Sequence, residues 1–329
     1  MKIINLRKLP ISAGLNEQFA IDVLTGLSSR PKKLSSKYFY DDRGSDLFQK
    51  ITREPDYYLT NKEYLILEKE SKIITQIIEK NDAIDIIELG AGDGHKSKLI
   101  IESFLDANIQ VNYYPIDISE QAMNLLENNL SNSPLLTVQA VVADYFTGLS
   151  HIKSSSKNPK LVLFLGSNIG NFDPQQSLEF MCNLFRCLNN KDYVLIGFDQ
   201  KKDIRVLNKA YNDSAGITAE FNLNILARMN RELGADFLLE RFQHYGFYNP
   251  KLGAMESHLI SLTDHQVTLS ALNRSFNFKK FEAIHLEYSY KFLPSDIERL
   301  CSQAGYSLTR NFADDEGYFL SSLWSVTKV

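Results

Sequence analysis

A short acidic and glycine-rich segment is the part of this 329-residue sequence best suited to chemistry. Residues 84–96 read Ile-Asp-Ile-Ile-Glu-Leu-Gly-Ala-Gly-Asp-Gly-His-Lys, an apolar run that ends in an acid and is followed by three alternating glycines. The apolar run indicates a buried parallel strand, and the glycines would let a cofactor lie against bare backbone. The segment therefore indicates a cofactor-binding loop that opens a helix near Lys96.

The glycine spacing bears on which cofactor is bound. Gly90, Gly92 and Gly94 form G-x-G-x-G, whereas the nicotinamide dinucleotide fingerprint is G-x-G-x-x-G. Asp93 inside the loop would also oppose a diphosphate at the helix N-terminus. The loop therefore favours S-adenosylmethionine over a nicotinamide dinucleotide, although the glycines could also serve a tight turn alone.

Acidic residues close the next two apolar runs. Asp117 suits the ribose hydroxyls of either cofactor and does not discriminate between them. Asp144 precedes Tyr145, and this pair could accept a hydrogen bond from an adenine amino group and stack on its ring. The pair favours S-adenosylmethionine, with helix capping as the alternative role of Asp144.

Strand and helix patterns alternate through the middle of the chain. Residues 62–80, 119–130 and 175–189 have helical spacing, and strand candidates lie at 84–89, 111–116, 137–142, 160–165 and 193–198. This order predicts a parallel, doubly wound α/β sheet whose ligands bind beyond the carboxyl ends of the strands. These ends are marked by Glu88, Asp117, Asp144, Gly166 and Asp199.

The flanking segments indicate a second domain. Helical patterns at 203–214 and 217–232 precede polar, aromatic-rich segments, and a helix (295–304) with two strands (305–310 and 318–327) could complete the first sheet as an edge hairpin. We expect a cofactor-binding domain of residues 62–200 plus 292–329. The remaining residues, 1–61 plus 201–291, would form a second α+β domain that binds the substrate.

Composition narrows the function classes. The chain is 44% hydrophobic, so it can bury a core, and its net charge of −4 without a basic block argues against nucleic acid. Cys182, Cys187 and Cys301 lack metal-ligand spacing, and the six histidines show no HxH or HExxH pattern, so no metal site is predicted. No apolar run is long enough for a signal peptide or a membrane span. We therefore expect a cytoplasmic protein with a small-molecule substrate and, because no exposed heptad is readable, a monomer.

Several longer motifs are more specific than the glycine loop. They combine aromatic, acidic and amide residues, and they lie at 37–41 (Lys-Tyr-Phe-Tyr-Asp), 44–48, 51–53, 55–58, 164–171 (Phe-Leu-Gly-Ser-Asn-Ile-Gly-Asn), 210–213, 216–218, 221–222, 230–233 and 287–292 (Glu-Tyr-Ser-Tyr-Lys-Phe). Through them the chain, from about residue 20 to its C-terminus, resembles the histidine Nα-methyltransferase family of ergothioneine biosynthesis. One departure is the loop, where the family often has serine or threonine in place of Asp93 and Gly94.

The resemblance implies a function and a site. It implies an S-adenosylmethionine-dependent enzyme that methylates the α-amino group of L-histidine to the trimethylated betaine, hercynine, on a Rossmann-like class I methyltransferase sheet with a second domain. Cofactor contacts would come from Gly90, Lys96, Asp117, Asp144 and Tyr145. The amino-acid backbone would contact Tyr40, Tyr57, Asn171 and Tyr211, and the imidazole would contact Glu287 and Ser289.

The residue types agree with these roles. Residues 283–292 alternate, so Glu287 and Ser289 share one strand face, and a carboxylate with a hydroxyl can satisfy both imidazole nitrogens. Tyr57, Tyr211 and Asn171 can donate to a carboxylate, although core tyrosines and, at Asn171, turn chemistry are the plainer interpretations. Tyr40 is the candidate that orients the amine, and Phe39 or Tyr40 could favour a methylated cation.

Three alternatives remain open. The same chemistry could act on another amine, such as a tryptophan-like amino acid, because a few pocket changes could exchange imidazole for indole. The chain could instead be a non-catalytic cofactor-binding module, which would bind the cofactor without turnover. A dehydrogenase is the third, and it would have to bind a nicotinamide dinucleotide.

Overall fold

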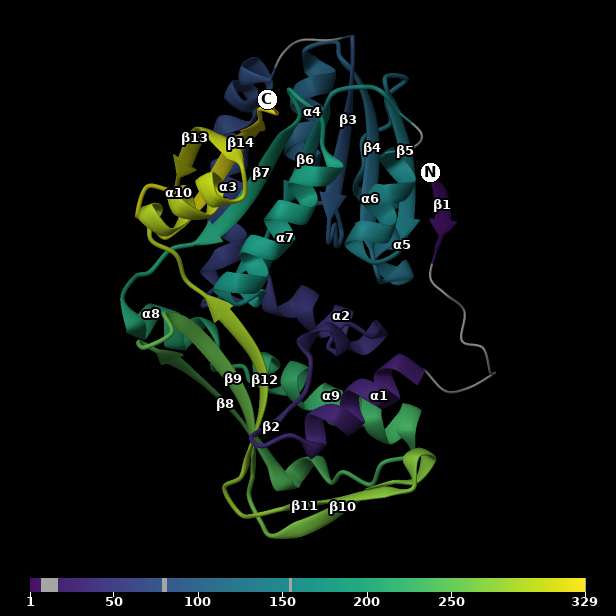
Figure 1. Cartoon of the computed structure of the whole chain (residues 1–329), viewed down its shortest axis with the longest axis vertical. Coiled ribbons are helices and arrows are strands. Elements are labelled where there is room, and N and C mark those ends of the chain that lie inside the picture. Colours follow the sequence, from purple (N-terminus) through teal and green to yellow (C-terminus); the bar gives the residue numbers. More distant parts are fainter. Residues whose placement is uncertain (7–16, 79–81, 154–155, 329) are drawn as a thin grey trace. The chain divides into compact units, whose positions relative to one another are not determined.

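A computed structural model describes residues 1–6, 17–78, 82–153 and 156–328. It divides the chain into two compact units (Figure 1). The first unit comprises Met1–Arg7, Leu59–Lys201 and Tyr290–Val329, and the second comprises Lys8–Tyr58 and Lys202–Ser289. The predicted domains had placed the whole N-terminal segment in the second, whereas the strand at Lys2–Asn5 pairs within the first unit.

The first unit contains a large mixed sheet. Among the described residues its strands follow the order β1-β5-β4-β3-β6-β7-β14-β13. The strand bounds are β1 Lys2–Asn5, β3 Ala83–Leu89, β4 Gln110–Asp117, β5 Leu136–Val142, β6 Lys160–Phe164, β7 Tyr193–Asp199, β13 Tyr306–Ala313 and β14 Phe319–Val326. The strands from β1 to β7 pair in parallel, and β14 pairs antiparallel with β7 and β13. The predicted doubly wound α/β sheet with an antiparallel edge hairpin is confirmed.

The helices of the first unit follow the predicted pattern closely. Their bounds are α3 Tyr58–Ile77, α4 Ser97–Asp106, α5 Glu120–Asn129, α6 Tyr145–Lys153, α7 Pro174–Cys187 and α10 Pro294–Gln303, with the 3₁₀ turn η2 at Asn168–Asn171. Asp173 begins α7 with a capping box to Gln176, and Pro174 occupies its first turn, so the start of α7 is specified locally.

The strands of this sheet are continuous apolar runs in the sequence because both of their faces are buried. In β3 every residue after Ala83 is buried, as expected where helices cover both faces of a parallel sheet. One face contributes residues such as Ile87, Phe164 and Ile196 to a core shared with α6, α7 and α10. These three helices lie on the same side of the sheet in Figure 1. The residues that end the parallel strands or directly follow them lie together at the edge of the sheet where these strands have their carboxyl ends.

The second unit combines a smaller sheet, a hairpin and helices. Its described strands are β2 Lys32–Lys33, β8 Phe242–Asn249, β9 Ala254–Ser261 and β12 Ala283–Tyr290, in the order β2-β12-β9-β8, with a separate hairpin of β10 His265–Leu269 and β11 Arg274–Phe278. The helices are α1 Glu17–Ser28, α2 Asp42–Ile51, α8 Ile204–Ala210 and α9 Ile217–Leu233, with 3₁₀ turns η1 Ser36–Tyr38, η3 Leu239–Arg241 and η4 Ser270–Leu272. Helix α8 ends before the predicted 214.

An apolar core holds the second unit together. Residues from α1, α2, α9, β9 and β12 form it, among them Phe19, Leu47, Ile225, Leu259 and Ile284. The side chain of Asp41 caps α2 by accepting from the backbone N–H of Gly44 at 2.8 Å. Asp41 also accepts from Asn224 and Arg231 of α9, so a single carboxylate fixes the start of α2 against α9.

Among the described helices, none is both long and apolar enough to cross a lipid bilayer.

Candidate active site

The glycine loop after β3 has the backbone that its sequence requires. Gly90, Gly92 and Gly94 have φ angles of 75°, 55° and 71°, a region that side chains with a Cβ rarely adopt. A Cβ built on Gly92 would meet no atom within 4 Å, so open space lies beside the middle of the loop. The alternating glycines therefore serve a tight turn and also leave room at the edge of the sheet.

Asp117 lies beside this loop at the end of β4. Its carboxylate accepts hydrogen bonds from the backbone N–H groups of Gly92 (3.3 Å) and Ser119 (2.9 Å). Burial raises the pKa of Asp117, because these donors replace bulk water only in part. The geometry provides a fixed acceptor of the kind that a ribose diol needs.

Tyr145 approaches the same loop from the start of α6. A Cβ built on Gly90 would lie 3.1 Å from the Tyr145 hydroxyl oxygen. Burial and the neighbouring Asp117 carboxylate raise the pKa of Tyr145. Its ring makes edge contacts with Phe164 and Phe180, with centroids 5.8 Å and 5.9 Å away. Tyr145 thus joins the core to the glycine loop.

Asp144 has a structural task in addition to any ligand role. Its carboxylate accepts from the backbone N–H of Thr147 (3.0 Å) and from the Thr147 hydroxyl (2.6 Å), as an N-terminal cap of a helix does. Burial alone would raise the pKa of Asp144, but these hydrogen bonds hold it below its usual value. The capping alternative recognised in the sequence is therefore present, and adenine binding by Asp144 stays a prediction.

Lys96 is held by an acid that the sequence analysis did not identify. Its ammonium pairs with Oε2 of Glu63 on α3, and Glu63 is fully buried. The same oxygen accepts from the backbone N–H of Gly166 at 2.8 Å. Glu63 therefore ties Lys96 to the end of β6. A signal existed, because Glu63 falls on the apolar stripe of its helix with Ile66 and Leu67, where a charge is unusual.

Glu88, the acid that closes β3, is completely buried as well. It accepts a hydrogen bond from the Tyr113 hydroxyl, which also contacts Ser97 at 3.1 Å. Burial raises the pKa of Glu88 to about 7, although the hydrogen bond from Tyr113 opposes the shift. Near neutral pH the protonated and ionised forms of Glu88 are therefore both populated beneath the glycine loop.

These residues fit S-adenosylmethionine. Gly92 faces open space, Asp117 is a half-buried acceptor, and Lys96 carries a positive charge at the same edge of the sheet. A nucleoside with an amino-acid tail needs an acceptor for its ribose hydroxyls and a cation near its carboxylate. The first unit supplies both groups within the loop region predicted from the sequence.

In the second unit, the structure brings together four predicted substrate residues from distant segments. Tyr40 contacts Phe48 and Phe221, with ring centroids 5.5 Å and 5.7 Å away. Tyr57 lies 6.3 Å from Phe48 and 6.3 Å from Tyr211, measured between centroids. We call Tyr40, Phe48, Tyr57, Tyr211 and Ser289 the aromatic–hydroxyl cluster.

A hydrogen bond joins this cluster to β12. The hydroxyls of Tyr211 and Ser289 are 2.7 Å apart and buried, and either can be the donor. These two residues were predicted to contact opposite ends of an amino acid, so their direct contact was not expected. Glu287 lies two residues earlier on the same strand and is half-buried.

The predicted alternation along β12 holds only in part. Ile284 and Leu286 lie in the core, but Tyr288 is half-buried and Ser289 is buried. Beyond the strand, Lys291 pairs with Asp199 at 2.7 Å in the first unit, and both side chains are fully buried. Asp199, which the sequence analysis places at a strand end, thus neutralises the lysine that follows β12.

The structure also shows the surroundings of Asn171, Phe39 and Tyr40, three residues that the sequence analysis assigns to the substrate site. Asn171 ends η2 in the first unit, where it is exposed two residues before the capping residue Asp173. Phe39 is fully buried against Phe221, and its contact with a methylated cation stays a prediction. Tyr40 is half-buried, and its contact with the substrate amine stays a prediction.

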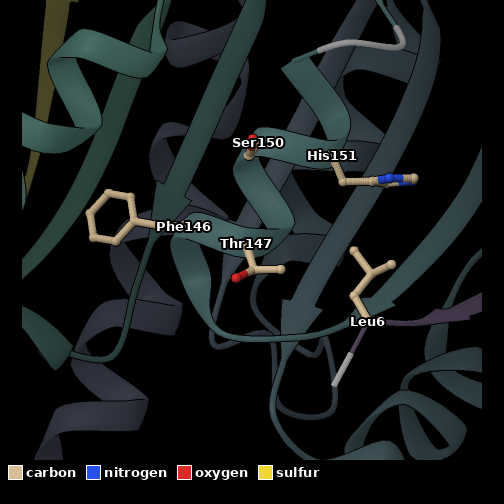
Figure 2. A pocket seen from close by; sticks show the side chains of 5 residues that line it. All are labelled: Leu6, Phe146, Thr147, Ser150 and His151. Atoms are coloured by element: carbon tan, nitrogen blue, oxygen red, sulfur yellow. The ribbon is translucent and has the colours of Figure 1, made fainter. Parts of the chain in front are cut away.

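An open pocket of about 610 Å³ lies on the first unit, and its lining residue Thr147 is hydrogen-bonded to Asp144. Figure 2 shows its described lining by Leu6, Phe146, Thr147, Ser150 and His151, four of which project from α6. The described lining offers hydroxyl and imidazole groups but no carboxylate and no lysine or arginine, so we do not assign the cofactor to it.

Comparison with known proteins gives a consistent result. Residues 19–326 match the sequence profile of the family described as "Histidine-specific methyltransferase, SAM-dependent". The chain is 36% identical over 303 residues to a histidine N-alpha-methyltransferase of Mycolicibacterium smegmatis, covering 92% of this chain and 93% of that protein. A Mycobacterium tuberculosis protein with the same name is 33% identical over the same shares of both chains. Ergothioneine biosynthesis protein 1 of Neurospora crassa is 30% identical over 92% of this chain and 34% of its own length.

The profile match covers nearly the whole chain, including both units and every predicted site residue. The match to a methyltransferase family argues against the alternative of a nicotinamide-dependent dehydrogenase. The chain belongs to the family of histidine-specific, S-adenosylmethionine-dependent methyltransferases.

Proposed function

We propose that this S-adenosylmethionine-dependent methyltransferase methylates the α-amino group of L-histidine and continues to the trimethylated betaine, hercynine. The single observation that carries this proposal is the aromatic–hydroxyl cluster, in which Tyr40, Tyr57, Tyr211 and Ser289 come together from separate elements of the second unit. The names of the bacterial relatives support histidine as the acceptor, and the fungal relative's name supports a role in ergothioneine biosynthesis.

The first unit is proposed to hold the cofactor. The loop at Gly90, together with Asp117, would bind the nucleoside, and Lys96 would neutralise the carboxylate of its amino-acid tail. Asp144 and Tyr145 remain the proposed adenine contacts. When bound, the cofactor supplies a methyl group on a sulfonium that is already activated, so the protein's main contribution is positioning.

The second unit is proposed to bind the amino acid through neutral donors. The hydroxyls of Tyr57 and Tyr211 can donate to a carboxylate without adding charge. Glu287 and Ser289 would satisfy the two imidazole nitrogens. Because Tyr211 and Ser289 already share a hydrogen bond, substrate hydrogen bonds would replace that contact. Asn171 stays a predicted substrate contact contributed by the first unit.

Tyr40 is proposed to orient the amine. A free amine is needed for attack, and a phenol with a pKa of about 10 is poorly matched to remove its proton at neutral pH. A hydrogen bond to the Tyr40 oxygen would instead hold the nitrogen in one direction. Tyr40 packs against Phe48 and Phe221, and this packing restricts its ring.

Mass spectrometry of reactions with the full chain tests the proposal. Histidine and S-adenosylmethionine should give products with one, two and three added methyl groups, whereas tryptophan offered at the same concentration should react far more slowly. Methylation of tryptophan but not histidine would establish the alternative acceptor. Binding of S-adenosylhomocysteine without turnover of either amino acid would instead support the non-catalytic alternative.

A matched pair of variants tests the site itself. Ser289→Ala should raise the histidine KM, whereas Ser257→Ala, a buried serine on β9 of the same unit, should leave it near the wild-type value. Equal kinetics in the two variants would remove Ser289 from the proposed site.

We also propose that the enzyme acts as a cytoplasmic monomer on a small molecule, without nucleic-acid or membrane partners. The free thiols of Cys182, Cys187 and Cys301 support a reducing compartment. Light scattering of the purified chain tests the oligomeric state, and a dimer would contradict it.

A further inference from the structure

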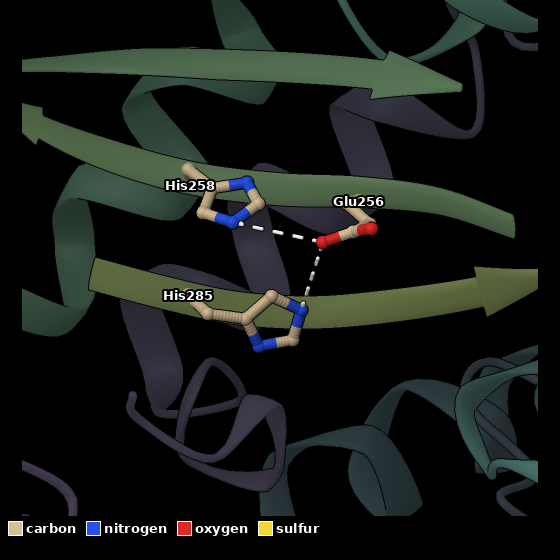
Figure 3. Close-up of side chains that lie close together, drawn as sticks. All are labelled: Glu256, His258 and His285. Carbon is tan, nitrogen blue, oxygen red and sulfur yellow. Dashed lines mark ion pairs between the residues drawn. The ribbon is translucent and has the colours of Figure 1, made fainter. Parts of the chain in front are cut away.

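Two histidines and a glutamate meet on the small sheet of the second unit. Glu256 and His258 lie on β9, and His285 lies on the neighbouring strand β12. One potential ligand atom from each residue lies within 4.8 Å of the other two. Figure 3 shows the imidazoles of His258 and His285 turned toward the Glu256 carboxylate. We call these three side chains the His–His–Glu cluster.

The distances leave the cluster without internal hydrogen bonds. The Nε2 atoms of His258 and His285 lie 3.7 Å and 3.8 Å from Oε2 of Glu256, which is too long for a hydrogen bond. Nε2 of His285 is buried and has no hydrogen-bond partner, and the same holds for Nδ1 of His258. A buried imidazole nitrogen aimed at a carboxylate but bonded to nothing is costly unless a ligand satisfies it.

The charge state of the cluster suits a cation. Burial lowers the pKa of His258, and burial together with His258 and Lys33 lowers the pKa of His285 to about 4. A neutral imidazole has one ring nitrogen with a free lone pair, which it can donate to a metal. Glu256 contributes the negative charge, and its Oε1 accepts from Asn249 at 2.7 Å, which fixes the direction of the carboxylate.

The geometry points to a binding site for one zinc-class divalent cation, held by Glu256, His258 and His285. Two imidazoles and one carboxylate are ligands that zinc and neighbouring transition metals prefer, whereas magnesium and calcium prefer all-oxygen sites. Zinc–nitrogen bonds of about 2.0–2.1 Å place tetrahedral ligand atoms roughly 3.3 Å apart, so small side-chain rotations would close the site. Three protein ligands leave one position for water or another small ligand.

The sequence did not reveal this site because His285 is far along the chain from Glu256 and His258. His258 and His285 lie on different strands, and only the adjacency of β9 and β12 brings them together. A bound cation would link these two strands and stabilise the second unit. Lys33, which pairs with His285 in the register of β2 and β12, places a positive charge nearby that opposes the cation.

Calorimetric titration of zinc chloride into the full chain tests the inference. The protein is first treated with a chelator and exchanged into buffer without amino acids, because free histidine binds zinc. Cys182 and Cys187 are replaced by serine in every sample, since these partly exposed thiols also bind zinc. One equivalent should bind, and cobalt in place of zinc should give the visible absorption of a site with imidazole ligands.

Matched variants assign the binding to the cluster. His258→Gln, His285→Gln and Glu256→Gln should each weaken zinc binding by roughly tenfold or more. His265→Gln, a histidine on β10 of the same unit that contacts the Thr263 carbonyl, should bind zinc like the parent. Lys33→Ala should bind it more tightly, because a nearby positive charge is removed.

The experiment distinguishes a variant that does not fold from a variant that folds but does not bind zinc. If one histidine variant does not fold, as judged by circular dichroism, Glu256→Gln carries the test because it changes one atom. No zinc binding in the parent, or equal binding in the parent and the three ligand variants, would overturn the inference. The readout is independent of methylation, so it can fail while the proposed function holds.

Discussion

The two units build their candidate sites from different materials. In the first unit the site consists of charged groups fixed by opposite charges or by backbone N–H groups, as with Lys96 on Glu63 and Asp117 on Gly92. In the second unit it consists of aromatic rings and hydroxyls that contact one another, as with Tyr57, Tyr211 and Ser289. The comparison indicates that fixed charges suit a charged cofactor, whereas neutral donors suit an amino acid whose amine must become neutral before it reacts.

The largest expected effect follows from breaking the buried ion pair of the first unit. Glu63→Gln leaves the partly buried Lys96 ammonium without a charged partner, which should reduce the free energy of unfolding by about 3–5 kcal/mol. Urea titration of the full chain measures this loss. Glu316→Gln is the control, because its pairing with Lys62 is exposed to solvent and should contribute little to stability. Similar losses in both variants would show that Glu63 behaves as a surface charge.

A second effect of the first unit depends on pH. The pKa of Glu88 is about 7 in the folded protein and 4.5 for an unperturbed glutamate, so the folded state binds this proton more tightly. The resulting stabilisation is fully present below the unfolded pKa and is lost as the pH rises through the folded pKa. Between these two values the free energy of unfolding should fall by about 3 kcal/mol.

Glu88→Gln provides the measurement. The variant keeps a group that can hydrogen-bond to Tyr113 but cannot ionise. Urea titrations at several pH values should show its stability relative to wild type increasing from acidic to neutral pH. Parallel stability curves for the two proteins would contradict the raised pKa of Glu88.

Asp117 tests whether the first unit alone determines cofactor affinity. Asp117→Ala removes the acceptor beside Gly92 and should weaken S-adenosylhomocysteine binding about 100-fold, equivalent to about 3 kcal/mol. Calorimetry with the full chain measures it. Asp203→Ala, on an exposed helix start in the second unit, should bind like wild type. Wild-type affinity in Asp117→Ala would place the ribose elsewhere.

The contrast between the units also explains what could be predicted from sequence. The first sheet followed from local patterns, because each apolar run and each acid after it is a short-range signal. Gly90 and Asp117 were found in this way and lie side by side. Glu63 was missed because its partner Lys96 is 33 residues away, although a glutamate on an apolar helix stripe was a usable signal.

The candidate site residues of the second unit could not be predicted from local sequence patterns alone. Tyr40, Tyr57, Tyr211 and Ser289 were identified through the family resemblance, since with 16 tyrosines in the chain the residue type alone selects none. The hydrogen bond between Tyr211 and Ser289 spans 78 residues and depends on how β12 packs. The His–His–Glu cluster was missed for the same reason, because strand pairing rather than sequence spacing brings its members together.

A substitution at Tyr211 tests whether the second unit determines substrate affinity, as Asp117→Ala tests cofactor affinity in the first unit. Tyr211→Phe removes one neutral hydroxyl and leaves Ser289 without that partner, so the histidine KM should rise about tenfold, equivalent to about 1.4 kcal/mol. Steady-state kinetics measure it, and S-adenosylhomocysteine affinity should stay unchanged. Tyr245→Phe is the matched control, because Tyr245 is exposed on β8 of the same unit. A loss confined to cofactor affinity would reverse the assignment of the two units.

The smallest effect concerns Asp144, where capping and ligand binding compete as explanations. Serine caps helices about as well as aspartate, so Asp144→Ser should change the free energy of unfolding by less than about 0.5 kcal/mol. If the Asp144 carboxylate also accepts from the adenine amino group, S-adenosylhomocysteine affinity should fall severalfold while stability is retained. Calorimetry and urea titration of the same sample separate the two quantities. Unchanged affinity would show that Asp144 serves α6 alone, and the charged part of the cofactor site would then reduce to Lys96 and Asp117.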